Sequence, residues 1–134
     1  MKRIALAAAV LCLTMIICGG SFAQPLHALE IKDAGICLDV VDLQCQGKDV
    51  QFSSSLGKLY CFTRVVGATT PVTITHVWYY GDKERARVRL EVRSTDWRTY
   101  SSKIIQPHET GHWRVEILGP DGTVLKTIEF TVVP

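Results

Sequence analysis

The stretch VTITHVWYYGDKERARVRLEV, residues 72–92, decides the fold. In its second half the apolar residues Ala86, Val88, Leu90 and Val92 alternate with charged ones, a period of two that is typical of a strand with one buried face. Its first half is rich in β-branched and aromatic residues, which favour strands. Turn-forming residues follow from Gly81. The stretch therefore predicts an antiparallel hairpin.

The alternation also predicts the register of this hairpin. A three-residue loop at 81–83 places the aromatic and aliphatic residues of the first strand opposite those of the second, whereas a two-residue loop places them among the arginines. The first arrangement buries more apolar surface, at about 25 cal/mol per Å². It places His76 on the inner face and an arginine ladder (Arg85, Arg87 and Arg89) on the outer face. The predicted pairs are Trp78 with Ala86, His76 with Val88, and Ile74 with Leu90.

Further strands flank the hairpin on both sides. Apolar alternation or β-rich composition predicts strands at 36–43, 59–66, 112–118 and 124–133, and one with an irregular start within 94–105. Turn residues gather at 67–71, 107–111 and 119–122, and the polar segment 44–57 is expected to be a loop. The sequence thus predicts a small antiparallel β-sandwich, immunoglobulin-like, with about seven strands.

The N-terminus resembles an export signal. Lys2 and Arg3 precede an apolar run at 4–17, and the small residues Ser21 and Ala23 fit a cleavage site. We expect a signal peptide at 1–23 cleaved after Ala23, a lead-in at 24–35 and the sandwich domain at 36–134. The protein would then be periplasmic or secreted, and it would contact the membrane only if the leader is kept as an anchor.

Charge argues against a nucleic-acid partner. The 134 residues carry 15 Lys and Arg against 13 Asp and Glu, a formal charge of +2. Removing Lys2 and Arg3 with the leader leaves 13 basic residues, so the mature chain is neutral. A neutral domain lacks the basic surface that binding to nucleic acid requires.

Cysteine spacing favours a disulfide over a metal site. Cys37, Cys45 and Cys61 remain after cleavage, an odd number for an exported protein. We expect Cys37–Cys61, since both lie in predicted strands, with Cys45–Cys61 as the alternative. No CxxC pair occurs, and Pro107 and Gly111 beside the histidines at 108 and 112 disfavour the helix that would bring those two together. No metal or cofactor is predicted.

The segment WRTYSSK, residues 97–103, is the densest polar and aromatic cluster. Trp97, Arg98, Tyr100 and Lys103 are candidate binding residues, because an aromatic ring stacks on a sugar and a guanidinium binds a carboxylate. The alternative is a strand whose Trp packs in the core and whose Arg and Lys cover it. No phosphate-binding glycine loop or nucleophile elbow is present, so no catalytic residue is predicted.

Four ordered motifs resemble the DUF2914 domain, a bacterial domain of unknown function. They are LYCFT (59–63), HVWYYG (76–81), WRTYSSK (97–103) and GHWRVE (111–116), followed by Gly122 and Phe130. The resemblance covers about residues 40–132 and implies an exported or membrane-associated bacterial protein with a small, mostly β domain. It assigns no catalytic residues, and it adds His76 and Trp78 to the binding candidates as motif members.

Three functions follow as hypotheses. The first is a non-catalytic module of the cell envelope that binds an unidentified protein or glycan. The second is an envelope enzyme that uses His76 with Arg98, which requires the two side chains to meet in one pocket. The third is a structural domain that self-assembles through the arginine ladder.

Overall fold

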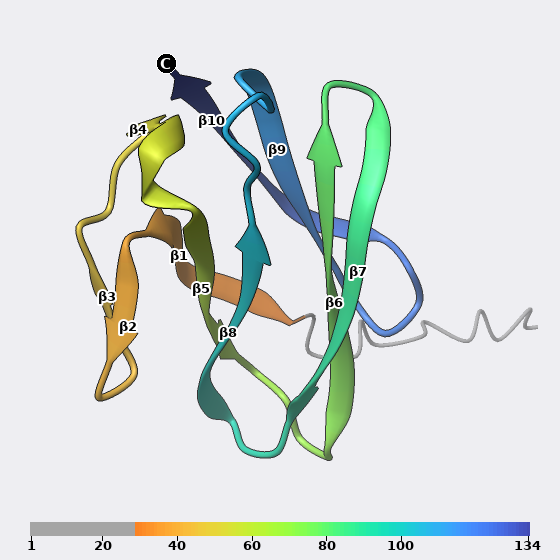
Figure 1. Ribbon diagram of the computed structural model, residues 1–134. Helices are drawn as coiled ribbons and strands as arrows, with labels where there is room; N and C mark the ends of the chain where they lie inside the picture. Colours follow the sequence, from red (N-terminus) through yellow and green to blue (C-terminus); the bar gives the residue numbers. More distant parts are fainter. Residues whose placement is uncertain (1–28) are drawn as a thin grey trace, which may run out of the picture.

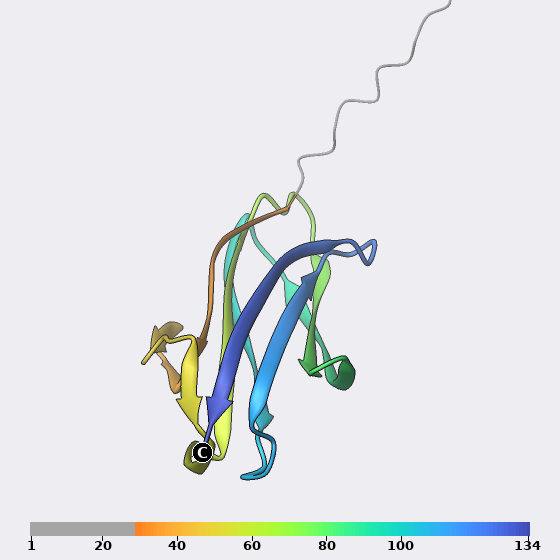
Figure 2. The same ribbon diagram turned by 90° about the horizontal axis from the view of Figure 1, so that it is seen from above.

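The computed structural model describes residues 29–134 of the chain. This part contains ten strands. The predicted signal peptide and its cleavage after Ala23 lie outside these residues. Strands facing each other in two layers confirm the β-sandwich (Figures 1 and 2). The prediction of about seven strands is wrong, because three further strands are only three residues long, too short for an alternating pattern to reveal them. Among residues 29–134, no helix is long and apolar enough to cross a membrane.

The two layers differ in size. The smaller sheet has the order β1-β5-β8 and is antiparallel, and the larger one has the order β4-β10-β9-β6-β7. β4 pairs with β10 in parallel, and β2 and β3 form a separate hairpin. The bounds are β1 Glu30–Cys37, β2 Asp39–Val41, β3 Gln44–Gln46, β4 Gln51–Ser53, β5 Lys58–Val66, β6 Val72–Tyr80, β7 Lys83–Val92, β8 Asp96–Ile104, β9 Gly111–Leu118 and β10 Val124–Val133, with a 3-10 turn at Ser54–Leu56.

The core lies between the sheets and is rich in aromatic rings. Trp78, Trp113 and Phe130 are almost completely buried. The Phe130 ring stacks on Trp113 with centroids 6.1 Å apart and meets Trp78 edge-on at 6.2 Å. Offset and edge-on contacts of this kind add stability beyond the area that they bury.

The predicted pairs of the central hairpin are confirmed. Trp78 pairs with Ala86, and the other two predicted pairs follow in the same register. The loop is shorter than predicted, because Tyr80 pairs with Lys83 and leaves only two residues in the turn. The register shifts between Trp78 and Tyr79, so that Arg85 is the extra residue of a bulge. Because of this shift, Trp78 stands opposite Ala86 on the inner face, as predicted.

Several boundaries near the N-terminus differ from the prediction. The strand expected at 36–43 is divided, because β1 ends at Cys37 and β2 spans Asp39–Val41. β1 begins at Glu30, inside the predicted lead-in at 24–35. The segment 44–57, expected to be a loop, contains β3, β4 and the 3-10 turn. The element β4 is held by a neighbour distant in sequence, because Phe52 is buried and pairs with Val132 of β10, whereas β3 pairs with the adjacent β2.

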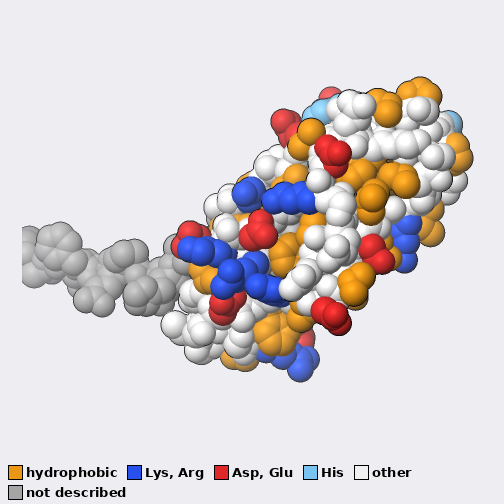
Figure 3. Space-filling view, turned by 90° about the vertical axis from the view of Figure 1, so that its left-hand side faces the viewer, with side chains coloured by type: hydrophobic (Ala, Val, Ile, Leu, Met, Phe, Trp, Pro, Cys, Tyr) orange, Lys and Arg blue, Asp and Glu red, His pale blue; other side chains and the backbone are white. Residues whose placement is uncertain are grey.

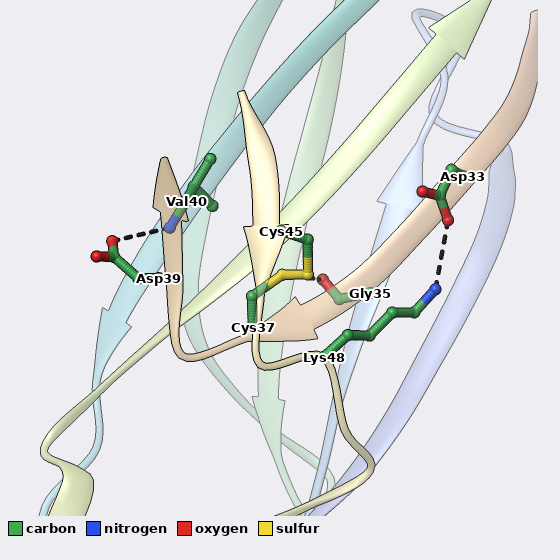
Figure 4. Close-up of a disulfide and its surroundings, with 7 residues drawn as sticks. All are labelled: Asp33, Gly35, Cys37, Asp39, Val40, Cys45 and Lys48. Carbon is green, nitrogen blue, oxygen red and sulfur yellow. Dashed lines mark hydrogen bonds and ion pairs between the residues drawn. A yellow bond between two sulfur atoms is a disulfide. The ribbon is translucent and has the colours of Figure 1, made fainter. Parts of the chain in front are cut away.

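The disulfide joins Cys37 to Cys45, so the predicted Cys37–Cys61 bridge is wrong (Figure 4). In the β1–β5 register Cys61 stands opposite Ile36, whereas Cys37 stands opposite Tyr60. Because neighbouring residues of a strand point to opposite faces, Cys37 and Cys61 lie on different sides of the sheet. Cys61 is a free thiol in the core, and burial raises its pKa to about 12.

Candidate functional site

Strand β8 places the four residues of the predicted binding cluster on two opposite faces of the smaller sheet. Trp97 packs against the core, whereas Arg98 and Tyr100 are exposed on the outer face of the smaller sheet. The Tyr100 ring lies 6.1 Å from that of Tyr60, centroid to centroid. Lys103 lies on the same face of β8 as Trp97, and its ammonium donates to the carbonyl of Ile104 at 2.8 Å. Of the four residues, only Arg98 and Tyr100 therefore share the outer face.

His76 and Trp78 lie inside the sandwich, at a buried polar cluster. The His76 ring nitrogens lie 2.9 Å from Thr63 Oγ1 and 2.7 Å from Ser101 Oγ. Trp78 Nε1 donates to the same serine oxygen at 3.1 Å. Burial lowers the pKa of His76 to about 4, so the ring is neutral at pH 7. Because Ser101 points inward and Arg98 outward, the structure does not bring His76 and Arg98 together.

A hairpin held by the disulfide covers part of the outer face beside Arg98. The turn between β2 and β3 consists of Asp42 and Leu43, both with positive φ (51° and 55°). Arg98 Nη1 donates to the carbonyl of Leu43 at 3.4 Å. The Cys37–Cys45 bond fixes the other end of the hairpin to β1, and Figure 1 shows the hairpin standing beside β5 and β8.

Two shallow depressions meet at Arg98 and Leu43. The first, which we call the hairpin groove, has a volume of about 320 Å³ and is lined by Asp33, Leu43, Gln44, Cys45, Lys48, Phe62, Arg64 and Arg98. The second, the edge groove, has a volume of about 430 Å³ and is lined by Leu43, Ser94, Asp96, Trp97 and Arg98. Figure 3 views this side of the molecule, where Lys and Arg gather with a few acidic side chains toward the left and apolar side chains are scattered beyond.

The cations of the hairpin groove differ in their partners. Lys48 pairs with Asp33 at 3.3 Å, and Arg64 donates twice to Asp96, at 2.9 and 2.7 Å. The Arg64 hydrogen bond holds the pKa of Asp96 below its usual range. Arg98 stands directly opposite Arg64 in the β5–β8 register, and within residues 29–134 it makes no ion pair. Among the three cations that line the hairpin groove, Arg98 is thus the one without a carboxylate.

Gly35 explains how Lys48 reaches the groove. A Cβ at position 35 would lie 2.5 Å from Cε of Lys48, so the lysine stem lies on the bare backbone of β1. Its ammonium then extends to Asp33, as Figure 4 shows. A side chain at position 35 would displace this lysine.

The arginine ladder of β7 is largely neutralised. Arg85 forms an ion pair with Glu109, and Arg87 pairs with Glu84 at 2.7 Å. Glu109 is buried and also accepts from the backbone N–H of Gln106 at 2.9 Å. The sequence does not point to Glu109, because an acidic residue in a segment expected to be a turn carries no signal of burial.

Metal-ligating side chains do not converge in the part of the chain that the structure describes. No group of three His, Cys, Asp or Glu is arranged to hold an ion there. His112 Nε2 lies 3.5 Å from a carboxylate oxygen of Glu129 at the surface of the larger sheet.

Comparison with protein families confirms the resemblance for three of the four motifs, whereas LYCFT at 59–63 and the rest of the expected coverage before residue 71 lie outside the match. Residues 71–132 match the family model described as "Protein of unknown function (DUF2914)". The matched region includes Trp97 and Arg98 of β8. It begins after β5, so the disulfide hairpin and Arg64 lie outside it. No curated protein matches this chain.

Comparison with solved structures confirms the fold class. The chain is similar to an immunoglobulin-like protein from Pseudomonas aeruginosa, with a TM-score of 0.50 and 15% sequence identity, over 82% of this chain and 100% of that one. At this identity the likeness concerns the fold, which is an immunoglobulin-like β-sandwich.

Proposed function

We propose that this chain, which carries the DUF2914 sequence at residues 71–132, is an exported non-catalytic module that binds a protein or glycan of the cell envelope. The leader-like N-terminus supports a periplasmic or secreted location. The proposed contact surface is the outer face of the smaller sheet around Arg98. The observation that carries the proposal is an exposed guanidinium between two grooves, without an ion pair in the described residues.

The position of Arg98 has an energetic cost for the free protein. Like charges directly opposite on neighbouring strands are destabilising, and Arg98 faces Arg64. Asp96 is held by Arg64 through two hydrogen bonds, so it compensates mainly that arginine. An anionic group of a partner would offset the remaining repulsion.

The geometry gives less support to the other two functions. His76 has no solvent-exposed surface, and its ring nitrogens face Thr63 and Ser101 in the core, so a substrate at Arg98 would not reach it. In the arginine ladder, Arg85 and Arg87 are engaged by carboxylates of the same chain. A self-assembling surface built on the ladder would have to break these pairs.

Binding to immobilised envelope glycans and envelope proteins tests the proposal. The chain from Gln24 onward is compared with Arg98→Gln and with Arg89→Gln, which changes an exposed arginine on the other sheet. We expect Arg98→Gln to lower retention of a defined ligand at least about tenfold, the size of a charged hydrogen-bond contact. Arg89→Gln should leave retention unchanged. Equal retention by all three proteins, or equal loss in both variants, would refute a role for this face.

A further inference from the structure

We infer that the hairpin groove binds the carboxylate of an acidic oligosaccharide, with Arg98 as its anchor. This inference rests on the proposed function and names the ligand class of the same face. It is carried by the charge of the groove, the geometry of its arginines and the polarity of its walls.

The charge of the groove favours an anion. Three cations and one carboxylate line it; Lys48 and Asp33 offset each other and Arg64 is paired with Asp96, so the net positive charge of the groove comes from Arg98. Arg64 and Arg98 stand side by side on the same face of the sheet. A depression lined mainly by one sign of charge attracts the opposite charge.

The guanidinium of Arg98 has donors to spare for a carboxylate. It carries five N–H groups, and its hydrogen bond within the protein is the one from Nη1 to the Leu43 carbonyl, which at 3.4 Å is long. The planar fork of an arginine matches the two oxygens of a carboxylate, and such pairs are among the strongest hydrogen-bonded contacts. Arg64 uses Nε and Nη2 on Asp96, so the donors left for a bound acid are mainly those of Arg98.

The walls of the groove suit a hydroxyl-bearing ring more than an apolar side chain. Phe62, the aromatic residue among the lining, is only 4% exposed and offers little surface for an apolar anchor, so Leu43, 47% exposed, is the most accessible apolar side chain there. Gln44, Asp33 and Lys48 supply hydrogen-bonding groups around it. Protein partners usually insert an aromatic or aliphatic anchor into a pocket, which this shallow groove lacks. A volume of about 320 Å³ lies at the small end of ligand sites, whose range is about 300–1,000 Å³.

The edge groove extends the site beyond a single sugar. Leu43 and Arg98 line both grooves, so a chain seated in the first continues past them into the second. There Ser94 and Asp96 can hydrogen-bond to hydroxyl groups, and Trp97 contributes to the wall. The ligand is therefore an oligosaccharide with a carboxylate at the position of Arg98.

Calorimetric titration with trigalacturonate tests the ligand class. The comparison ligand is its methyl ester, which keeps the shape of the sugar and removes the charge. We expect the free acid to bind and the ester to bind at least about tenfold more weakly. Arg98→Gln should weaken binding of the acid at least about tenfold. Arg98→Lys should be intermediate, since it keeps the charge but loses the fork. Arg89→Gln is the matched control and should bind as the unchanged chain does.

Four results would overturn the inference: absence of binding to trigalacturonate, equal binding of acid and ester, full binding by Arg98→Gln, or tighter binding of a glutamate tripeptide than of trigalacturonate. If capture of another envelope ligand still depends on Arg98, the proposed function stands and only the sugar class fails. If that capture does not depend on Arg98, both fail. Because Arg98 is exposed, its variants should keep the fold, which the circular dichroism spectrum checks.

Discussion

Acidification is expected to destabilise the sandwich through His76. The ring is fully buried, and burial lowers its pKa from 6.5 to about 4. In the unfolded chain the ring is solvated and takes up a proton near pH 6.5. Between these two values the unfolded state binds more protons than the folded state, so the free energy of unfolding falls as the pH falls.

The magnitude follows from the two pKa values. One pKa unit corresponds to 1.36 kcal/mol, so a difference of about 2.5 units amounts to about 3 kcal/mol. The contribution of His76 to the free energy of unfolding is fully present above pH 6.5, declines between pH 6.5 and about 4, and is lost below about pH 4. For a small domain stable by about 5–15 kcal/mol, the loss is a substantial fraction.

Urea unfolding at several pH values between 7.5 and 4 measures this loss. The His76→Gln variant removes the titrating group and retains one hydrogen-bond donor and one acceptor beside Thr63 and Ser101. We expect the free energy of unfolding of the unchanged chain to fall about 3 kcal/mol more than that of the variant. His112→Gln, a change at an exposed histidine, is the control and should behave as the unchanged chain.

Parallel pH profiles of the unchanged chain and His76→Gln would refute the reasoning. If the variant does not fold, proton NMR of the unchanged chain serves instead. The His76 imidazole resonance should then move only below about pH 5 while the protein is folded. Titration of that resonance near pH 6.5 in the folded protein would contradict the assignment of a desolvated neutral ring.

Other predictions concern the cysteines and the buried carboxylate. Replacing Cys37 and Cys45 by Ala should lower the urea-unfolding free energy by about 2.5 kcal/mol, as loop closure predicts for residues eight apart, and an unchanged midpoint would contradict this. Iodoacetamide should label Cys61 only after unfolding, since its thiol is buried; mass spectrometry of the native protein showing rapid labelling would disagree. Arg85→Met should cost about 3 kcal/mol because it leaves the Glu109 carboxylate buried without its cation. Glu109→Gln should cost less, since its amide still accepts from the Gln106 N–H, and the reverse order in thermal unfolding would be inconsistent with the ion pair.

Sequence patterns predicted the elements whose own residues carry the signal. The alternation around Leu90 was sufficient to pair the central strands, because burial of one face fixes their register. It did not predict the bulge at Arg85, since a turn of two residues with a bulge and a turn of three give the same pairs beyond it. The short strands β3 and β4 were missed because their stability comes from β2 and β10, not from local periodicity.

The candidate site was predicted only in part, because adjacent residues of a strand lie on opposite faces of the sheet. Trp97 and Arg98 are adjacent in sequence, so a strand necessarily sends them to opposite sides. The same rule separates Cys37 from Cys61 once their register across β1 and β5 is known. The pairing of Arg98 with Arg64 and the cover over both depend on contacts between distant segments, which one sequence does not reveal.

The place of β10 has a consequence for the order of assembly. This strand lies inside the larger sheet, between β9 and β4, and β4 precedes it by about 70 residues. A chain that emerges N-terminus first, from a ribosome or a translocation channel, can close the β6–β7 hairpin early but cannot complete the sheet until residues 124–133 have appeared. Phe52 would lack part of its cover until then, because Phe130 packs on it and Val132 pairs with it. Nascent-chain truncation before Val124 should therefore leave a species that binds chaperones or aggregates.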